Sequence, residues 1–72
     1  MKLAENLIMY RKSKKLTQAD IAQRIGVDVR AYQRYEYGER YPQLPLLIAL
    51  ANLYGISIDE LVGHEVEGNE DS

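Results

Sequence analysis

Two helix starts follow one another closely between Leu16 and Gly38, in LTQADIAQRIGVDVRAYQRYEYG, and this limits the possible folds more than any other feature. Thr17 and Asp20 form a capping box, in which a hydroxyl and a carboxylate satisfy free backbone N–H groups at the start of a helix. Gly26 favours the left-handed backbone that ends a helix, and Asp28 is a preferred residue for capping the next one. The segment therefore predicts two short helices joined by a tight turn.

The apolar residues of this segment support the same division. Ile21, Ala22 and Ile25 share one face of the first short helix, and Tyr32 and Tyr35 share one face of the second. A gap of about three or four residues that contains a glycine is the geometry of a helix-turn-helix motif.

The rest of the chain predicts three further helices and no strand. We expect five helices, at about residues 2–14, 17–25, 28–37, 44–54 and 57–62, in a compact all-α fold with the motif at the second and third. Ser57 and Glu60 form a second capping box. Residues 1–63 are expected to be one domain. Residues 64–72 lack an apolar period, and we expect them to be an acidic, disordered tail.

Positive charge is concentrated near the motif, although the whole chain has a net charge of −2. All nine Lys and Arg residues lie within residues 1–64, whereas four of the eleven Asp and Glu residues lie in the last eight. Residues 1–64 therefore carry a net charge of +2. The basic residues before and within the motif indicate a surface for a polyanion.

Composition excludes several classes of protein. The chain has no Cys and one His, which excludes disulfides and zinc clusters, so we expect no metal and no cofactor. It has neither the run of ~20 apolar residues of a membrane span nor a signal peptide, which favours the cytoplasm. No cysteine nucleophile, glycine-rich phosphate loop or catalytic triad is evident, and His64 is expected to be a solvated residue beside the tail. We therefore do not expect an enzyme.

Over residues 3–63 the chain resembles the Cro/repressor-type, or xenobiotic-response-element-like, helix-turn-helix family. The shared residues, which stand at the family's spacing, are Tyr10-Arg11, Leu16-Thr17-Gln18, Ile21-Ala22, Ile25-Gly26-Val27, Tyr35-Glu36-Tyr37-Gly38, Pro42 and Gly55-Ile56-Ser57-Ile58-Asp59-Glu60-Leu61. The resemblance implies a lambda-repressor-like fold and a sequence-specific binder of double-stranded DNA. It also implies a transcriptional regulator, most simply a repressor.

The resemblance also implies which residues contact DNA. Bases would be read by Val29, Arg30, Gln33 and Arg34, and phosphates would be contacted by Thr17, Gln18, Tyr37, Arg40 and Tyr41. Arg can bind the O6 and N7 atoms of guanine and Gln the N6 and N7 atoms of adenine, whereas Val29 offers only an apolar contact, for example to a thymine methyl. Asp28 would be a helix cap rather than a base reader. A solvated surface is the alternative for Gln18, Arg30 and Arg34.

Two further features of the motif are structural. The resemblance implies an ion pair between Arg11 and Glu36 that joins the first helix to the end of the third. Lys14-Lys15 stands where relatives often carry a glycine at the end of the first helix, so we expect either that Lys15 adopts an unfavourable backbone conformation or that the helix ends differently.

The fourth helix is apolar on more than one face. We expect a core stripe of Leu44, Leu47, Ile48, Ala51 and Tyr54, and a second face of Leu46, Ala49, Leu50 and Leu53. A helix that is apolar all round requires burial all round, so the second face predicts a homodimer. A two-fold dimer would place two reading helices about 34 Å apart on a pseudo-palindromic operator.

Two alternatives remain open. The leucines of the second face could be semi-exposed or pack against the tail. The fold could also serve as an antitoxin-like or other protein-interaction module with an unknown protein partner. The acidic tail and the leucine-rich fourth helix favour this second reading, and an antitoxin could also bind DNA.

Overall fold

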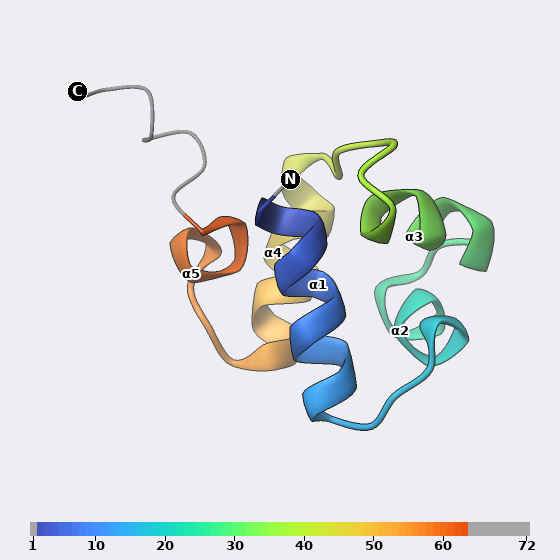
Figure 1. Ribbon diagram of the computed structural model, residues 1–72, viewed down its shortest axis with the longest axis horizontal. Coiled ribbons are helices and arrows are strands. Elements are labelled where there is room, and N and C mark those ends of the chain that lie inside the picture. The colour runs from blue at the N-terminus through green and yellow to red at the C-terminus, as the bar shows by residue number, and fades with distance from the viewer. Residues whose placement is uncertain (1, 64–72) are drawn as a thin grey trace.

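The computed structural model describes residues 2–63, which form five α-helices and, within that range, no strand. The helices are α1 (Lys2–Ser13), α2 (Gln18–Ile25), α3 (Val29–Glu36), α4 (Leu44–Tyr54) and α5 (Ile58–Val62) (Figure 1). The predicted all-α fold of five helices is confirmed, and each helix begins and ends within one residue of expectation. The tail expected at residues 64–72, together with His64, lies outside the described residues. No described helix is long and apolar enough to cross a membrane.

Side-chain caps fix where three of the helices begin. The Thr17 hydroxyl accepts the Asp20 N–H at 3.0 Å, and the Asp20 carboxylate accepts the Thr17 N–H at 2.9 Å, which completes the predicted capping box of α2. Ser57 and Glu60 form the same reciprocal pair at the start of α5. The Asp28 carboxylate accepts the Arg30 N–H at 3.0 Å and caps α3. Each cap residue precedes its helix, and replacing one with Ala typically costs about 1 kcal/mol.

The turn between α1 and α2 contains a strained residue. Lys15 has a φ of 58°, and it is the only residue other than glycine with a positive φ within residues 2–63. This agrees with the first of the two outcomes expected for a lysine at a position that favours glycine. The left-handed conformation costs roughly 1–2 kcal/mol for a residue with a Cβ atom.

All five helices contribute to one core. In Figure 1, α1 crosses the front of the molecule, α2 and α3 lie to one side of it, α5 lies to the other and α4 lies behind. The completely buried large side chains come from every helix: Leu3, Leu7, Ile21, Tyr32, Leu50 and Leu61. Because α3 packs against both α1 and α2, its orientation is fixed by two neighbours.

The buried face of α4 differs from the predicted one. Leu50, expected at a dimer interface, has an exposed fraction of 0% and belongs to the core. Leu44 and Ile48, expected in the core, have exposed fractions of 58% and 43%. The prediction was wrong at these three positions because α4 is apolar nearly all round, so the apolar period does not select a face. Its neighbours select the face instead, which consists of Leu47, Leu50, Ala51 and Tyr54.

Candidate nucleic-acid interface

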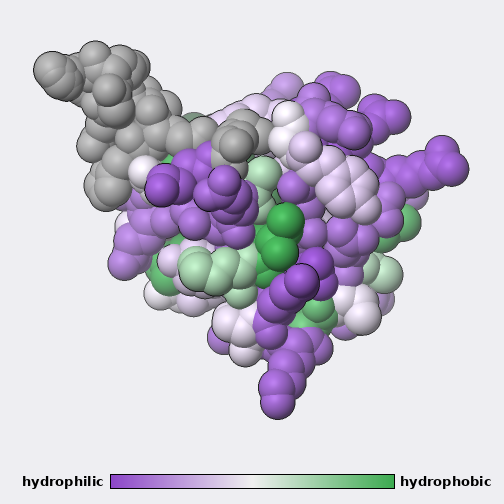
Figure 2. Space-filling view, viewed as in Figure 1, coloured by the Kyte–Doolittle hydropathy of each residue, from purple (hydrophilic) through white to green (hydrophobic). Residues whose placement is uncertain are grey.

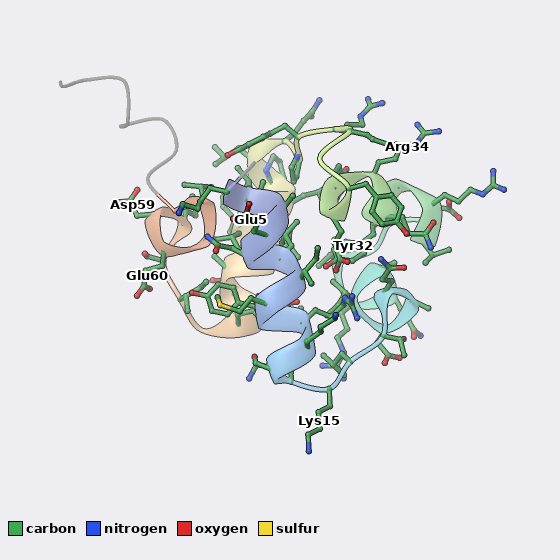
Figure 3. The ribbon with its side chains drawn as sticks, viewed as in Figure 1. Glu5, Lys15, Tyr32, Arg34, Asp59 and Glu60 are labelled. Atoms are coloured by element: carbon green, nitrogen blue, oxygen red, sulfur yellow. The ribbon has the colours of Figure 1, made fainter. Side chains whose placement is uncertain are left out.

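The aromatic residues of α3 determine which of its faces points outward. Tyr32 is completely buried and Tyr35 nearly so, and their rings meet edge to face with centroids 6.4 Å apart. Arg30 and Arg34 are therefore exposed, and Gln33 is half-buried between the core face and the outer face. Figure 3 shows Arg34 extending away from the body of the molecule. The helical period of α3 thus turns Arg30, Gln33 and Arg34 toward solvent, and we call these three residues the polar strip.

Predicted base-reading and phosphate residues meet in one shallow hollow. Its lining consists of Arg30, Gln33, Arg34, Tyr37 and Glu39. Figure 2 shows long hydrophilic side chains projecting from the side of the molecule formed by α2 and α3. The fourth predicted base reader, Val29, lies apart from this lining, and its half-buried side chain packs against the core. The hollow thus combines two guanidinium groups, an amide, a phenol and the carboxylate of Glu39.

A second hollow lies between the segment after α3 and the start of α4. Arg40 and Tyr41, both predicted phosphate contacts, line it together with Tyr35, Gln43, Pro45 and Leu46. Gln43 occupies the cap position of α4 but makes no side-chain hydrogen bond there. Arg40 and the positive end of the α4 dipole therefore border the same hollow, which favours an anion there.

The acidic side chains of α5 lie away from the first hollow (Figure 3). Figure 3 shows Asp59 and Glu60 at the opposite side of the molecule from Arg34. Within residues 2–63, the acidic residue lining the first hollow is Glu39. This separation lets a polyanion approach α3 without meeting the carboxylates of α5.

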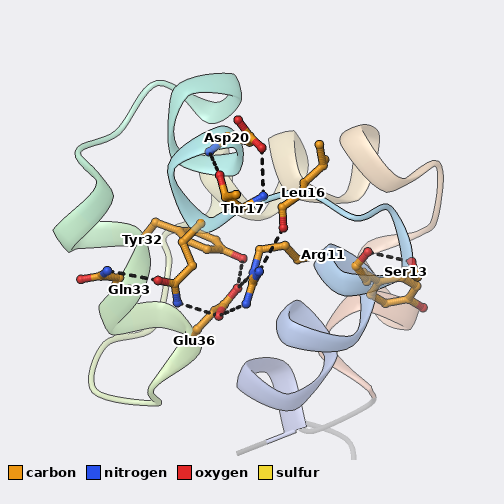
Figure 4. A network of polar contacts seen from close by, with 10 residues as sticks. Arg11, Ser13, Leu16, Thr17, Asp20, Tyr32, Gln33 and Glu36 are labelled. Atoms are coloured by element: carbon orange, nitrogen blue, oxygen red, sulfur yellow. Dashed lines mark hydrogen bonds and ion pairs between the residues drawn. The ribbon is translucent and has the colours of Figure 1, made fainter.

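A buried carboxylate joins α1, α2 and α3 beneath the polar strip. Glu36, with an exposed fraction of 4%, accepts hydrogen bonds at both carboxylate oxygens (Figure 4). Its Oε2 atom accepts from Arg11 Nε and from the Tyr32 hydroxyl, both at 2.6 Å. Its Oε1 atom accepts from Arg11 Nη2 at 3.2 Å and from Gln18 Nε2 at 3.0 Å. The ion pair implied by the resemblance is present, and it is part of a four-donor network.

The network determines the charge state of its members. Burial on its own raises the pKa of Glu36, but hydrogen bonds from Arg11, Tyr32 and Gln18 outweigh it, so the pKa of Glu36 is lowered. The hydrogen bond to Glu36 raises the pKa of Arg11. Both members of the pair are therefore charged at neutral pH, and each is the compensating charge of the other. Nearby, burial raises the pKa of the Tyr54 hydroxyl to about 12.

Gln18 connects this network to the polar strip. Its Nε2 atom donates to Glu36, and its Oε1 atom accepts from Gln33 Nε2 at 3.1 Å. Arg11 also donates to the Leu16 carbonyl at 3.0 Å, which ties the turn before α2 to α1. Gln18 thus braces α3 against α2.

The sequence predicted the pair of Arg11 and Glu36 but not the other hydrogen bonds of the network. Tyr32 was assigned to the core by its apolar ring, and the hydrogen bond of its hydroxyl was not anticipated. The spacing of four residues between Tyr32 and Glu36 is a signal that could have indicated it. The hydrogen bond between Gln33 and Gln18 carries no comparable local signal, because it depends on how α2 and α3 cross.

Two further residues of the predicted site, Thr17 and Asp28, act as helix caps. Thr17 is exposed and serves as the cap of α2, and Asp28 as the cap of α3. Within residues 2–63, no group of three or more His, Cys, Asp or Glu side chains could hold a metal ion.

The sequence pattern of the helix-turn-helix family matches residues 7–61, which is most of the chain. The chain belongs to the Cro/repressor-type helix-turn-helix family. The family expected from the sequence is therefore confirmed.

Helix-turn-helix proteins from bacteria are close to this chain in sequence. The cryptic phage CTXphi transcriptional repressor RstR of Vibrio cholerae is 43% identical over 63 residues, which cover 88% of this chain and 56% of that protein. The uncharacterized HTH-type transcriptional regulator YqaE of Bacillus subtilis is 42% identical over 62 residues, or 86% of this chain and 53% of that protein. The chain thus spans about half the length of these curated relatives.

A solved helix-turn-helix structure agrees with the fold. The crystal structure of a transcriptional regulator from Listeria innocua matches with a TM-score of 0.82 and 41% sequence identity. The match covers 85% of this chain and 57% of that chain. The similarity extends over most of the five-helix fold.

Proposed function

We propose that this helix-turn-helix chain is a sequence-specific, double-stranded DNA-binding regulator of transcription that acts as a repressor by occupying a promoter. The observation that carries the proposal is the outward polar strip of α3, where Arg30, Gln33 and Arg34 line one hollow above a buried brace. The name of RstR as a transcriptional repressor and the names of the other relatives as transcriptional regulators support it. We propose a cytoplasmic site of action, and we propose neither catalysis nor a cofactor.

The base contacts follow from the chemistry of the polar strip. Arg30 and Arg34 are exposed and have the paired donors that suit the O6 and N7 atoms of guanine. Val29 retains a partly exposed side chain that suits a thymine methyl. Asp28 contributes as a cap, because its carboxylate is already engaged by the Arg30 N–H.

Phosphate contacts flank this strip on two sides. Thr17 and Gln18 lie at the start of α2, where the helix dipole favours an anion. Tyr37, Arg40 and Tyr41 follow α3 and are all exposed. Hydroxyl and guanidinium groups of this kind position a protein on the DNA backbone without reading its sequence.

The exposed part of α4 supports a homodimer. Leu44 and Ile48 are exposed and one helical turn apart, and the half-buried Leu46, Ala49 and Leu53 lie on the same helix. We propose that these residues form a two-fold interface, from which Leu50 is excluded by its burial. A dimer would place two copies of α3 about 34 Å apart on a pseudo-palindrome.

The same apolar face favours a second candidate function. Leu44 and Ile48 could instead contact a different protein, as in an antitoxin or another interaction module. This candidate and DNA binding use different surfaces, so the DNA-reading function can be tested on its own.

The test of the DNA-reading function selects bound sequences from a random duplex library with the purified protein at one stated salt concentration, since backbone contacts depend strongly on salt. We expect enrichment of a two-fold-symmetric site. Enrichment of a single half-site would support DNA binding but contradict binding as a dimer. Failure to enrich any sequence would refute the DNA-reading function and favour the protein-interaction candidate.

A further inference from the structure

The amide of Gln33 is the outer end of a hydrogen-bond chain that begins at a buried charge. Glu36 Oε1 accepts from Gln18 Nε2 at 3.0 Å, and Gln18 Oε1 accepts from Gln33 Nε2 at 3.1 Å (Figure 4). Arg11 and Tyr32 occupy the remaining acceptor positions of Glu36 and hold its carboxylate in place. The chain thus runs from the core to the lining of the first hollow.

The direction of this chain is chemically determined. An ionised carboxylate only accepts hydrogen bonds, so Gln18 must present its NH₂ group to Glu36. The amide of Gln18 cannot turn over, and its oxygen must face Gln33. That oxygen also only accepts, so Gln33 must present an N–H to it. The carboxylate therefore sets the orientation of both amides in turn.

The groups left on Gln33 match one base. An amide has two N–H donors and a carbonyl acceptor, so the bond to Gln18 leaves Gln33 one N–H and its carbonyl oxygen. In the major groove, adenine displays the N7 acceptor beside the N6 donor, whereas guanine displays two acceptors, N7 and O6. The remaining pair on Gln33 can engage both groups of adenine but only one group of guanine.

We propose that Glu36, acting through Gln18, fixes the amide of Gln33 so that Gln33 selects adenine in each half-site. Gln33 is the specificity-determining residue, and Gln18 and Glu36 are positioning residues. The inference rests on the proposed DNA-binding function and adds the identity of one base and the residues that impose it.

The test compares base preferences among variants in the same duplex selection. Gln33→Ala identifies the operator position that Gln33 reads, because only that position should lose its preference. Gln18→Met breaks the chain while keeping a side chain of similar length. Gln18→Lys retains a donor for Glu36 but offers Gln33 no acceptor, so it breaks the chain without leaving the carboxylate short of a partner. Gln23→Met is the matched control, since Gln23 is an exposed glutamine on the same helix.

We expect the wild-type protein to prefer adenine at the position sensitive to Gln33→Ala by about fivefold to a hundredfold. Gln18→Met and Gln18→Lys should reduce that preference toward the level of Gln33→Ala and leave the other positions unchanged, and Gln23→Met should change nothing. A lost phosphate contact at Gln18 would weaken all sequences equally and leave the preference intact.

Three results would overturn the inference. The position sensitive to Gln33→Ala could select another base, both folded Gln18 variants could retain the full adenine preference, or Gln33→Ala could change no position. Each of these leaves DNA binding in place. If the wild-type protein enriches no sequence, the proposed function fails and this inference fails with it.

Discussion

Arg11→Met should destabilise the protein strongly, because it removes the only cation that contacts the buried Glu36 carboxylate within the described residues. The Arg11 and Glu36 side chains have exposed fractions of 14% and 1%, so water cannot replace the lost partner. The substitution deletes two of the four hydrogen bonds to Glu36, both charge-assisted. Each such bond contributes about 1.5–3 kcal/mol, and losing one partner of a buried pair costs about 3–5 kcal/mol.

A loss of that size is a large part of the total stability of a small domain, which is about 5–15 kcal/mol. Urea unfolding followed by circular dichroism would measure the free energy of unfolding. Lys12→Met is the matched control, because it removes the same charge from the neighbouring, exposed position of α1. We expect the control to change stability by less than about 0.5 kcal/mol.

The pH dependence provides an independent check of the cause. The pKa of Glu36 is lowered in the folded protein, so its contribution is present above the pKa of the unfolded state and is lost as pH falls through the folded value. The stability difference between wild type and Arg11→Met should therefore shrink as pH falls below the ordinary glutamate pKa of about 4.3. A loss no larger than that of Lys12→Met, or a difference that grows in acid, would refute the reasoning.

Three further predictions concern other parts of the molecule. Lys15→Gly should raise the free energy of unfolding by about 0.5–1 kcal/mol, because glycine relieves the left-handed strain at a φ of 58° at some entropic cost; thermal unfolding would show it, and an unchanged or lower midpoint would contradict it. Arg34→Ala should weaken binding to the selected operator by about 1–3 kcal/mol more than binding to unrelated duplex, as measured by fluorescence anisotropy; equal losses would make Arg34 a phosphate contact. Ile48→Glu should yield a monomer in sedimentation while Met9→Glu, an equivalent change at an exposed apolar position of α1, should not; an unchanged mass would remove Ile48 from the interface.

Local chemistry explains why the helix boundaries could be predicted from the sequence. Thr17, Asp28 and Ser57 each cap a helix through residues two or three positions away, and Gly26 and Gly55 end helices with a positive φ. These interactions lie within a few residues of the chain and need no tertiary contact. The alternation of Tyr32 and Tyr35 with Arg30 and Arg34 predicted the outward face of α3 for the same reason.

Apart from the ion pair between Arg11 and Glu36, which the resemblance implied, interactions between distant residues were not predicted. Asn6 donates to the Leu61 carbonyl at 2.9 Å, so α1 satisfies the end of α5 across 55 positions of sequence. The buried face of α4 depends on the neighbouring helices. This explains why Leu50 is buried, whereas Leu44 and Ile48, expected in the core, are exposed. The chain of amides from Glu36 to Gln33 likewise requires the crossing of α2 and α3.

The residues of the polar strip differ in how readily they can be substituted without disturbing other contacts. Arg30 and Arg34 form no side-chain hydrogen bond or ion pair with another described residue, whereas Gln33 is tied through Gln18 to the core. Because we propose that these arginines read bases, we expect a substitution at either one to change the preferred operator without disturbing the packing of the helices. A substitution at Gln33 also leaves the Gln18 oxygen without its partner. Operator preference in descendants of this chain should thus diverge first at the bases opposite Arg30 and Arg34, and last at the base opposite Gln33.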